Sequence, residues 1–332
     1  MHGCALEVYI DTVKLISKGG RMDIVAIINY KGGVGKTTVT ANLAAELAFR
    51  GQKVLVIDAD AQASLTFSFV APDEWDKQYK DSKTIKSWFD AVCQGVEPES
   101  LTSFVITPSP VNHSVQKNGG RIDLICSHLG LINVDLELAT LLRGSTLPQM
   151  KRSYIKVHGK LREAIAELAE TSDYDIVLID CPPNFNIVTK NAIVASEKIL
   201  IPAKPDYLST LGIAYLQRSV NDLVRDFNEY VQIDSQTKQI SPQILGVVFT
   251  MIQITSGEPI AAQKQYISQT RRLGVEVFNN YFRKNNTMFA TAPQYRRPVV
   301  LNRYPEERKN DIVFGIEQFV KEFKQSLNKG VQ

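Results

Sequence analysis

The sequence predicts an α/β protein in which a mostly parallel, twisted sheet carries helices on both faces. Two observations predict this class. Short apolar runs rich in Val and Ile alternate with longer amphipathic stretches, which is the pattern of repeated strand–helix–strand units. A glycine-rich segment, NYKGGVGKTT at 29–38, separates the first apolar run from the first amphipathic stretch, as a phosphate-binding loop does.

The apolar runs predict buried strands over 24–30, 53–60, 122–127, 174–180, 198–204 and 244–252. The amphipathic stretches predict helices over 37–50, 158–170, 185–196, 210–230, 259–272 and 311–327. Each crossover should be right-handed, because twisted strands and right-handed helices pack together in that way. The absence of internal repeats favours one domain over 22–332.

Two stretches depart from this rhythm. Residues 1–21 lack the apolar core of a secretory signal, and the first strand follows directly from Met22. We expect translation to start at Met22, with a disordered or loosely docked N-terminal extension as the alternative. Residues 70–120 contain clusters of Pro, Asp, Asn and Gly, which predict an irregular insertion that is exposed and mobile.

The bulk composition is that of a water-soluble globular protein. Of 332 residues, 44% are hydrophobic and 22% are charged, and no apolar run reaches the ~20 residues that span a bilayer. The four cysteines are scattered without a Cys-x-x-Cys pair. We therefore expect reduced thiols in the cytoplasm, without a disulfide or zinc framework.

The loop at 29–38 has the residue types that phosphate binding requires. Its glycines let successive backbone N–H groups turn inward, and the following helix adds its N-terminal partial charge. Lys36 is placed to reach the β- and γ-phosphates, and the Thr37 hydroxyl is placed for Mg²⁺. The residues expected to wrap the phosphates are Gly32, Gly33, Val34, Gly35, Lys36 and Thr37.

Acidic residues end two of the predicted strands. VLVIDADAQAS supplies Asp58 and Asp60, and IVLIDCPP supplies Asp180. A carboxylate at the end of an apolar strand is costly unless it meets a cation. We expect Asp58 and Asp180 to join Thr37 at the metal, and Asp60 to orient the attacking water.

Three motifs together, KGGVGKTT, VLVIDADAQAS and YDIVLIDCPP, resemble the ParA/Soj/MinD family of P-loop NTPases with a deviant Walker A loop. The resemblance implies an ATPase that uses ATP and Mg²⁺ and forms a homodimer when ATP binds. It also implies a role for the early lysine, Lys31, which in this family crosses to the nucleotide of the partner subunit. Lys31, Lys36 and Asp60 are thus the expected catalytic residues, and Thr38 joins the loop residues at the nucleotide.

The sequence departs from the family pattern at two places. Asp60 is followed by Ala61 and Gln62, whereas Pro-Gln is common in the family. The loop near 283–300 keeps an Ala-Pro pair but lacks the usual basic residues immediately upstream. By family position, the residues expected at the nucleotide base are Pro205, Thr250 and Met251.

Positive charge is concentrated towards the C-terminus. From residue 251 onward there are 13 Lys and Arg against 7 Asp and Glu, within a chain of net charge +3. This asymmetry favours a polyanionic partner, and the resemblance implies nonspecific DNA. The paired arginines expected to contact it, with solvated surface as the alternative, are Arg271, Arg272, Arg296 and Arg297.

The last predicted helix leaves a second function open. Its apolar stripe has Lys321 and Lys324 beside it and consists of Ile312, Ile316, Phe319, Phe323 and Leu327. We expect the stripe to pack on the sheet; a MinD-like positioning ATPase would instead bury such a helix in a membrane.

The sequence thus predicts an ATPase for plasmid or chromosome partition that associates with the nucleoid of a prokaryote. Its ATP-bound dimer would bind DNA, and a ParB-like protein or another adaptor would stimulate weak hydrolysis. The MinD-like membrane-associated ATPase is the alternative.

Overall fold

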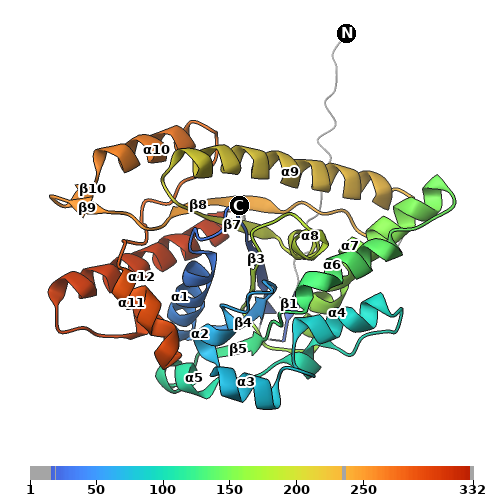
Figure 1. The fold of residues 1–332 in the computed structure, drawn as a ribbon, viewed down its shortest axis with the longest axis horizontal. Coiled ribbons are helices and arrows are strands. Elements are labelled where there is room, and N and C mark those ends of the chain that lie inside the picture. Colours follow the sequence, from blue (N-terminus) through green and yellow to red (C-terminus); the bar gives the residue numbers. More distant parts are fainter. Residues whose placement is uncertain (1–15, 19, 234–236, 330–332) are drawn as a thin grey trace, which may run out of the picture.

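Six parallel strands form the central sheet in the order β5–β4–β6–β3–β7–β8 (Figure 1). The computed structural model describes residues 16–18, 20–233 and 237–329. The strands are β3 (Asp23–Ile27), β4 (Lys53–Asp58), β5 (Arg121–Ile125), β6 (Ile176–Asp180), β7 (Lys198–Ala203) and β8 (Gln243–Phe249). The ends of all six lie within three residues of the predicted runs, and the predicted fold class is confirmed.

The strand order determines which loops meet. β3, which precedes the glycine-rich loop, lies between β6 and β7, and β4 lies on the other side of β6. Asp180 is the register partner of both Ile27 and Asp58. Because the strands are parallel, their carboxyl ends meet at one edge of the sheet, so the glycine-rich loop and the acidic strand ends come together there.

Helices cover both faces of the sheet (Figure 1). Alternate side chains of β3 point to opposite faces: Val25 and Ile27 pack in one core with Phe319, and Ile24 and Ala26 in the other with Trp88. The first core is covered by α1 (Lys36–Phe49), α5 (Ser109–Val115) and α12 (Glu307–Asn328). The second is covered by α4 (Ile85–Cys93), α6 (Leu131–Leu141), α7 (Leu147–Thr171), α8 (Ile187–Ala195) and α9 (Tyr207–Val231).

Smaller elements connect this framework. They are the short helices α2 (Thr66–Phe69), α3 (Pro72–Gln78), α10 (Ala261–Arg271) and α11 (Asn286–Thr291), and the two-residue strands β1 (Ile16–Ser17), β2 (Gly20–Arg21), β9 (Ile254–Thr255) and β10 (Glu258–Pro259). Four 3₁₀ turns complete them: η1 (Leu101–Phe104), η2 (Gln116–Asn118), η3 (Ala292–Tyr295) and η4 (Val299–Leu301). The N-terminal extension falls mostly outside the described residues, but β1 pairs with β2.

The region 70–120 is more ordered than predicted. It contains α3, α4 and α5, and α4 buries Trp88 and Phe89, each 1% exposed, against the sheet. The expectation of an irregular, exposed segment is therefore wrong for this part. Its helices are short and are separated by turns rich in Pro and Asp. The helical spacing of their apolar residues was therefore not recognised in the sequence.

The apolar stripe of α12 lies inside the protein. Ile316, Phe319 and Phe323 are fully buried, and Ile312 and Leu327 are 7% and 6% exposed. The prediction that the stripe packs on the sheet is confirmed, so it is not available to a membrane. None of the helices in the described ranges is both long and apolar enough to cross a bilayer.

Candidate functional site

The glycine-rich loop joins β3 to α1 in a conformation that suits an anion. Gly33 and Gly35 have φ values of 66° and 85°, a region that side chains disfavour. Gly35 is the N-cap residue of α1, and no side chain caps this helix end. The first N–H groups of α1 are therefore left for a ligand, and the helix dipole favours a negative one.

Lys36 lies inside this loop. It is 6% exposed, and its Nζ donates to the backbone oxygen of Asn29 at 3.4 Å. Burial lowers the pKa of Lys36, while the charges of Asp180 and Asp60 act in the opposite direction. A buried ammonium beside uncapped backbone N–H groups makes the loop a strong site for phosphate.

Asp180 meets two hydroxyl groups of α1. Thr37 Oγ1 donates to one carboxylate oxygen at 2.7 Å, and Thr40 Oγ1 donates to the other at 3.0 Å. Burial raises the pKa of Asp180 to about 6, although the Thr37 hydrogen bond and the charge of Lys36 lower it. Thr40 was not predicted; its position one helical turn after Lys36 is the signal that could have found it.

Asp58 lies on another part of the site. One of its oxygens accepts from Thr66 N at 2.8 Å and from Thr66 Oγ1 at 2.7 Å, and the other accepts from Asp60 N at 3.3 Å. Burial and the charge of Asp180 raise the pKa of Asp58 to about 8. Asp58 thus anchors the start of α2, while Asp60 is half-exposed and accepts from Gln62 N at 3.0 Å.

Lys31 lies in the loop but does not line the cavity over the start of α1. Its Nζ is 2.8 and 2.7 Å from the two carboxylate oxygens of Asp206, which caps α9 by accepting from Ser209 N at 2.8 Å. Asn29 also supports the loop, since its Oδ1 accepts from Lys31 N and its Nδ2 donates to Pro202 O.

A cavity of about 390 Å³ opens over the start of α1. Met251 lines it, whereas Thr250 is outside the lining and donates to Val34 O at 2.7 Å. Pro205 is buried and is not part of the lining. The lining residues that were not predicted include Asn42, Ser64, Ser68, Phe289, Ala292, Pro293 and Pro298.

Comparisons with known proteins agree with this geometry. The family described as an AAA domain matches residues 22–233. The chromosome partitioning protein ParA of Caulobacter vibrioides is 27% identical over 280 residues, which cover 84% of this chain and 86% of that protein. The sporulation initiation inhibitor protein Soj of Bacillus subtilis is 25% identical over 278 residues, covering 84% of this chain and 90% of that protein. The chain belongs to the ParA/Soj/MinD family of P-loop ATPases.

A solved structure supports the fold of this family member. An ATP complex of a McdA variant from Cyanothece matches it with a TM-score of 0.65 and 19% identity, covering 92% of this chain and 96% of that one. The likeness extends well beyond residue 233, so the segments that follow β7 belong to the same fold.

The four arginines of the predicted DNA surface have different environments. Arg271 and Arg272 are exposed at the end of α10. Arg296 is half-buried with a φ of 50°, and Arg297 donates to Leu301 O at 2.5 Å while its Nε is buried. Arg297 therefore has a structural contact of its own, because its side chain holds the backbone at Leu301.

The site fits a nucleotide with a divalent cation. Within the described ranges, no three His, Cys, Asp or Glu side chains gather as a self-sufficient metal site. Thr37 and Asp180 lie next to the phosphate loop, and Mg²⁺ commonly binds to one or two protein groups together with phosphates and water. The buried carboxylate of Asp180 would gain from the charge of such a cation.

Proposed function

We propose that this protein is a DNA partition ATPase that binds ATP and Mg²⁺, closes as a homodimer on nonspecific DNA, and hydrolyses ATP slowly until an adaptor stimulates it. The position of the Lys31 side chain is the observation that best supports this proposal. Lys36 lines the cavity over the phosphate loop, but Lys31 does not. Its ammonium is turned towards Asp206 at the start of α9, where a second subunit could receive it.

The residues of the phosphate loop have separable roles in this proposal. Lys36 and the first N–H groups of α1 would neutralise the β- and γ-phosphates, and Thr37 and Asp180 would hold Mg²⁺. ATP supplies the phosphoryl group whose transfer to water drives the cycle. Asp60, half-exposed at the edge of the site, would orient that water. Asp58 would hold α2, and with it Ser64 and Ser68, over the nucleotide.

An exposed apolar surface next to Lys31 supports the dimer. Tyr207, Leu208, Leu211 and Tyr215 are 64%, 63%, 42% and 55% exposed on the first turns of α9. Apolar side chains at this spacing form one stripe along a helix, and contiguous exposed patches of this kind mark interaction surfaces. The stripe begins directly after Asp206, so a second copy that covers it would also meet Lys31.

Nonspecific DNA is the partner that the charge distribution favours. A two-fold dimer doubles the excess of positive charge that follows residue 250, and Arg271 and Arg272 are exposed on α10. Phosphate contacts need no base recognition. The adaptor would be a ParB-like protein, and association with the nucleoid would follow from DNA binding.

Co-sedimentation tests this function directly. With ATP and Mg²⁺, the protein should sediment with long duplex DNA of any sequence and remain in the supernatant with anionic liposomes. Omitting ATP should abolish the DNA association. Sedimentation with liposomes but not with DNA would support a membrane positioning function instead and overturn the proposal.

A further inference from the structure

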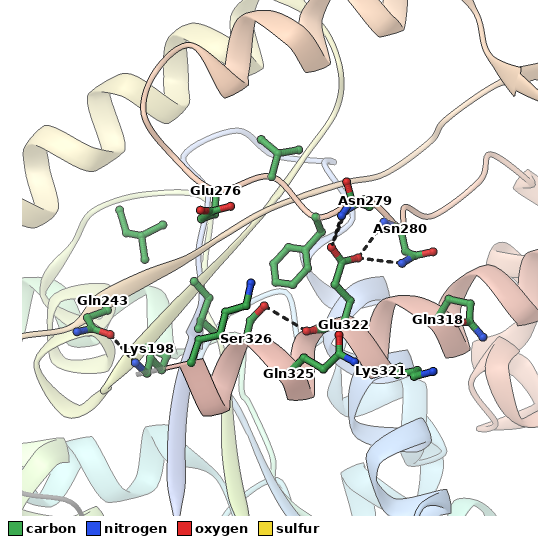
Figure 2. Close-up of a pocket in the computed structure, with 15 residues that line it drawn as sticks. Lys198, Gln243, Glu276, Asn279, Asn280, Gln318, Lys321, Glu322, Gln325 and Ser326 are labelled. Atoms are coloured by element: carbon green, nitrogen blue, oxygen red, sulfur yellow. Dashed lines mark hydrogen bonds between the residues drawn. The ribbon is translucent and has the colours of Figure 1, made fainter. Parts of the chain in front are cut away.

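A groove lies beside the first residues of β8 (Figure 2). Its volume is about 700 Å³. One wall is the start of β8, and the other is the polar side of α12 with the segment 276–280. The strands are parallel, and the nucleotide site lies where they end. The start of β8 is therefore at the opposite ends of the strands from the nucleotide site.

The edge of the sheet is open at this groove. β8 is the outermost strand, and the segment that follows α10 covers only its later residues. This cover begins where Val247 N donates to Glu276 O at 2.8 Å and Phe278 N donates to Val247 O at 3.0 Å. Ile244 is the register partner of Ile199 on β7, and Leu245 is the extra residue of a bulge before Gly246. Within the described ranges, neither residue pairs with a strand on the other side. An uncovered sheet edge is a template for an additional strand.

The close approach at Gly246 marks where the covering segment first meets β8. A Cβ atom at Gly246, whose φ is +149°, would lie 2.9 Å from Glu276 O. The outer segment reaches the edge at this point and then continues beside the later residues of β8, where Phe282 N donates to Phe249 O at 2.9 Å. The groove therefore lies before the point where the covering segment begins, and the two half-exposed residues before Gly246, Ile244 and Leu245, line it.

The charges in the groove favour an acidic ligand. The carboxylate of Glu322 accepts four hydrogen bonds, from the backbone and side-chain nitrogens of Asn279 and Asn280 at 2.8–3.0 Å (Figure 2). Both of its oxygens are therefore already occupied by neutral donors. Lys321 and Lys329 are exposed on the lining, and neither forms an ion pair with any residue in the described part of the chain. Glu276 is the other carboxylate of the lining and is exposed on the far wall.

We propose that this groove binds an extended acidic segment of a partner protein, which adds a short strand to β8. The backbone of the segment would pair with Ile244 and Leu245, and its carboxylates would meet Lys321 and Lys329. Addition of a strand to an open edge is a general mode of peptide recognition. Duplex DNA is less favoured, because it offers no row of N–H and C=O groups to the edge. This surface does not depend on the nucleotide site.

Fluorescence anisotropy with labelled peptides tests the proposal on the full chain. A short peptide of alternating Glu and Val should bind at least about tenfold more tightly than one of alternating Lys and Val, with or without ATP. N-methylation of alternate residues of the acidic peptide should weaken binding about fivefold or more, since it removes backbone donors without changing charge. Equal binding of the acidic and basic peptides, or no effect of N-methylation, would overturn the proposal.

Matched variants locate the binding surface. Lys321→Gln combined with Lys329→Gln should weaken the acidic peptide about threefold or more. The control Lys324→Gln changes the same helix outside the lining and should leave peptide binding unchanged. If the double variant instead lowers the affinity for a duplex DNA fragment and not for the peptide, the groove is a nucleic-acid surface and the proposal is wrong.

Discussion

The ammonium of Lys31 lies 2.7 Å from the carboxylate of Asp206, a residue 175 positions later in the same chain. Both side chains are about one-third exposed, at 32% and 39%. Solvent screening limits such a pair to roughly 0–1 kcal/mol. If Lys31 crosses to a partner subunit, closing of the dimer must first break this pair.

Removing the charge of Asp206 should therefore favour the dimer. In Asp206→Asn the amide oxygen can still accept from Ser209 N, so the cap of α9 is retained. We expect ATP-dependent dimerisation to strengthen by up to about fivefold, measured by analytical ultracentrifugation with a nonhydrolysable ATP analogue. Asp222→Asn, an exposed acid on the same helix, is the control. An Asp206→Asn dimer as weak as the parent would show that the pair does not restrain Lys31.

Loss of Lys31 itself should have the opposite effect. Lys31→Ala should bind ATP as a monomer, because Lys36 and the N–H groups of α1 remain, but it should not dimerise with the analogue. Light scattering measures the mass, and fluorescence of a labelled nucleotide measures binding. An unchanged monomer–dimer balance would mean that Lys31 acts only within its own subunit.

Asp60 and Lys36 should separate hydrolysis from binding. Asp60→Ala should bind ATP and remain as the ATP-bound dimer, because the water is no longer oriented. Lys36→Ala should lose productive nucleotide binding, since the buried cation at the phosphates is removed. Phosphate release and nucleotide binding, measured on both variants, check the assignment. Turnover in Asp60→Ala equal to that of the parent would refute the role of Asp60.

The exposed arginines of α10 should contribute to DNA binding. Arg271→Glu combined with Arg272→Glu should weaken binding similarly for unrelated sequences and reduce the salt slope by about one to two units. Arg225→Glu, on α9, is the control for a change of net charge. The pair Arg296 and Arg297 is a less clear test, because Arg297 also holds Leu301. DNA affinity equal to the parent would place the DNA surface elsewhere.

His158 should make folding stability depend on pH. Its ring stacks on Tyr154 at 4.0 Å, Nδ1 lies 2.9 Å from Tyr154 O, and the buried Nε2 has no hydrogen-bond partner among the described residues. Burial lowers the pKa of His158 from 6.5 to about 4. The unfolded chain thus takes up a proton first, so stability should fall between pH 6.5 and 4, by up to about 3 kcal/mol.

Urea unfolding at several pH values measures this effect. His158→Phe preserves the aromatic stack and should reduce the loss of stability over that pH range. His113→Phe, at an exposed position of α5, should keep the parent's pH dependence. An unchanged slope in His158→Phe would show that other groups cause the acid sensitivity.

The sequence by itself determined the strands, most of the helices and the phosphate loop. These features are local: apolar runs recur at the strand and helix periods, and Gly33 and Gly35 occupy positions with positive φ. α7 begins earlier than predicted, at Leu147, where Thr146 caps the helix by accepting from Gln149 N. That error was in reading a local signal, since Thr followed by Pro at the first turn is a helix start.

The tertiary structure alone decided what the side chains of the site meet. The carboxylate of Asp58 turns to Thr66 on α2, Phe289 and Pro293 reach the cavity over α1, and Arg297 holds a backbone oxygen. The partner of Lys31 is likewise brought to it from a distant helix. Periodicity reports only which face of an element is buried, whereas these contacts depend on strand order and on how connecting segments cross the sheet. Such long-range packing determines where each functional group points.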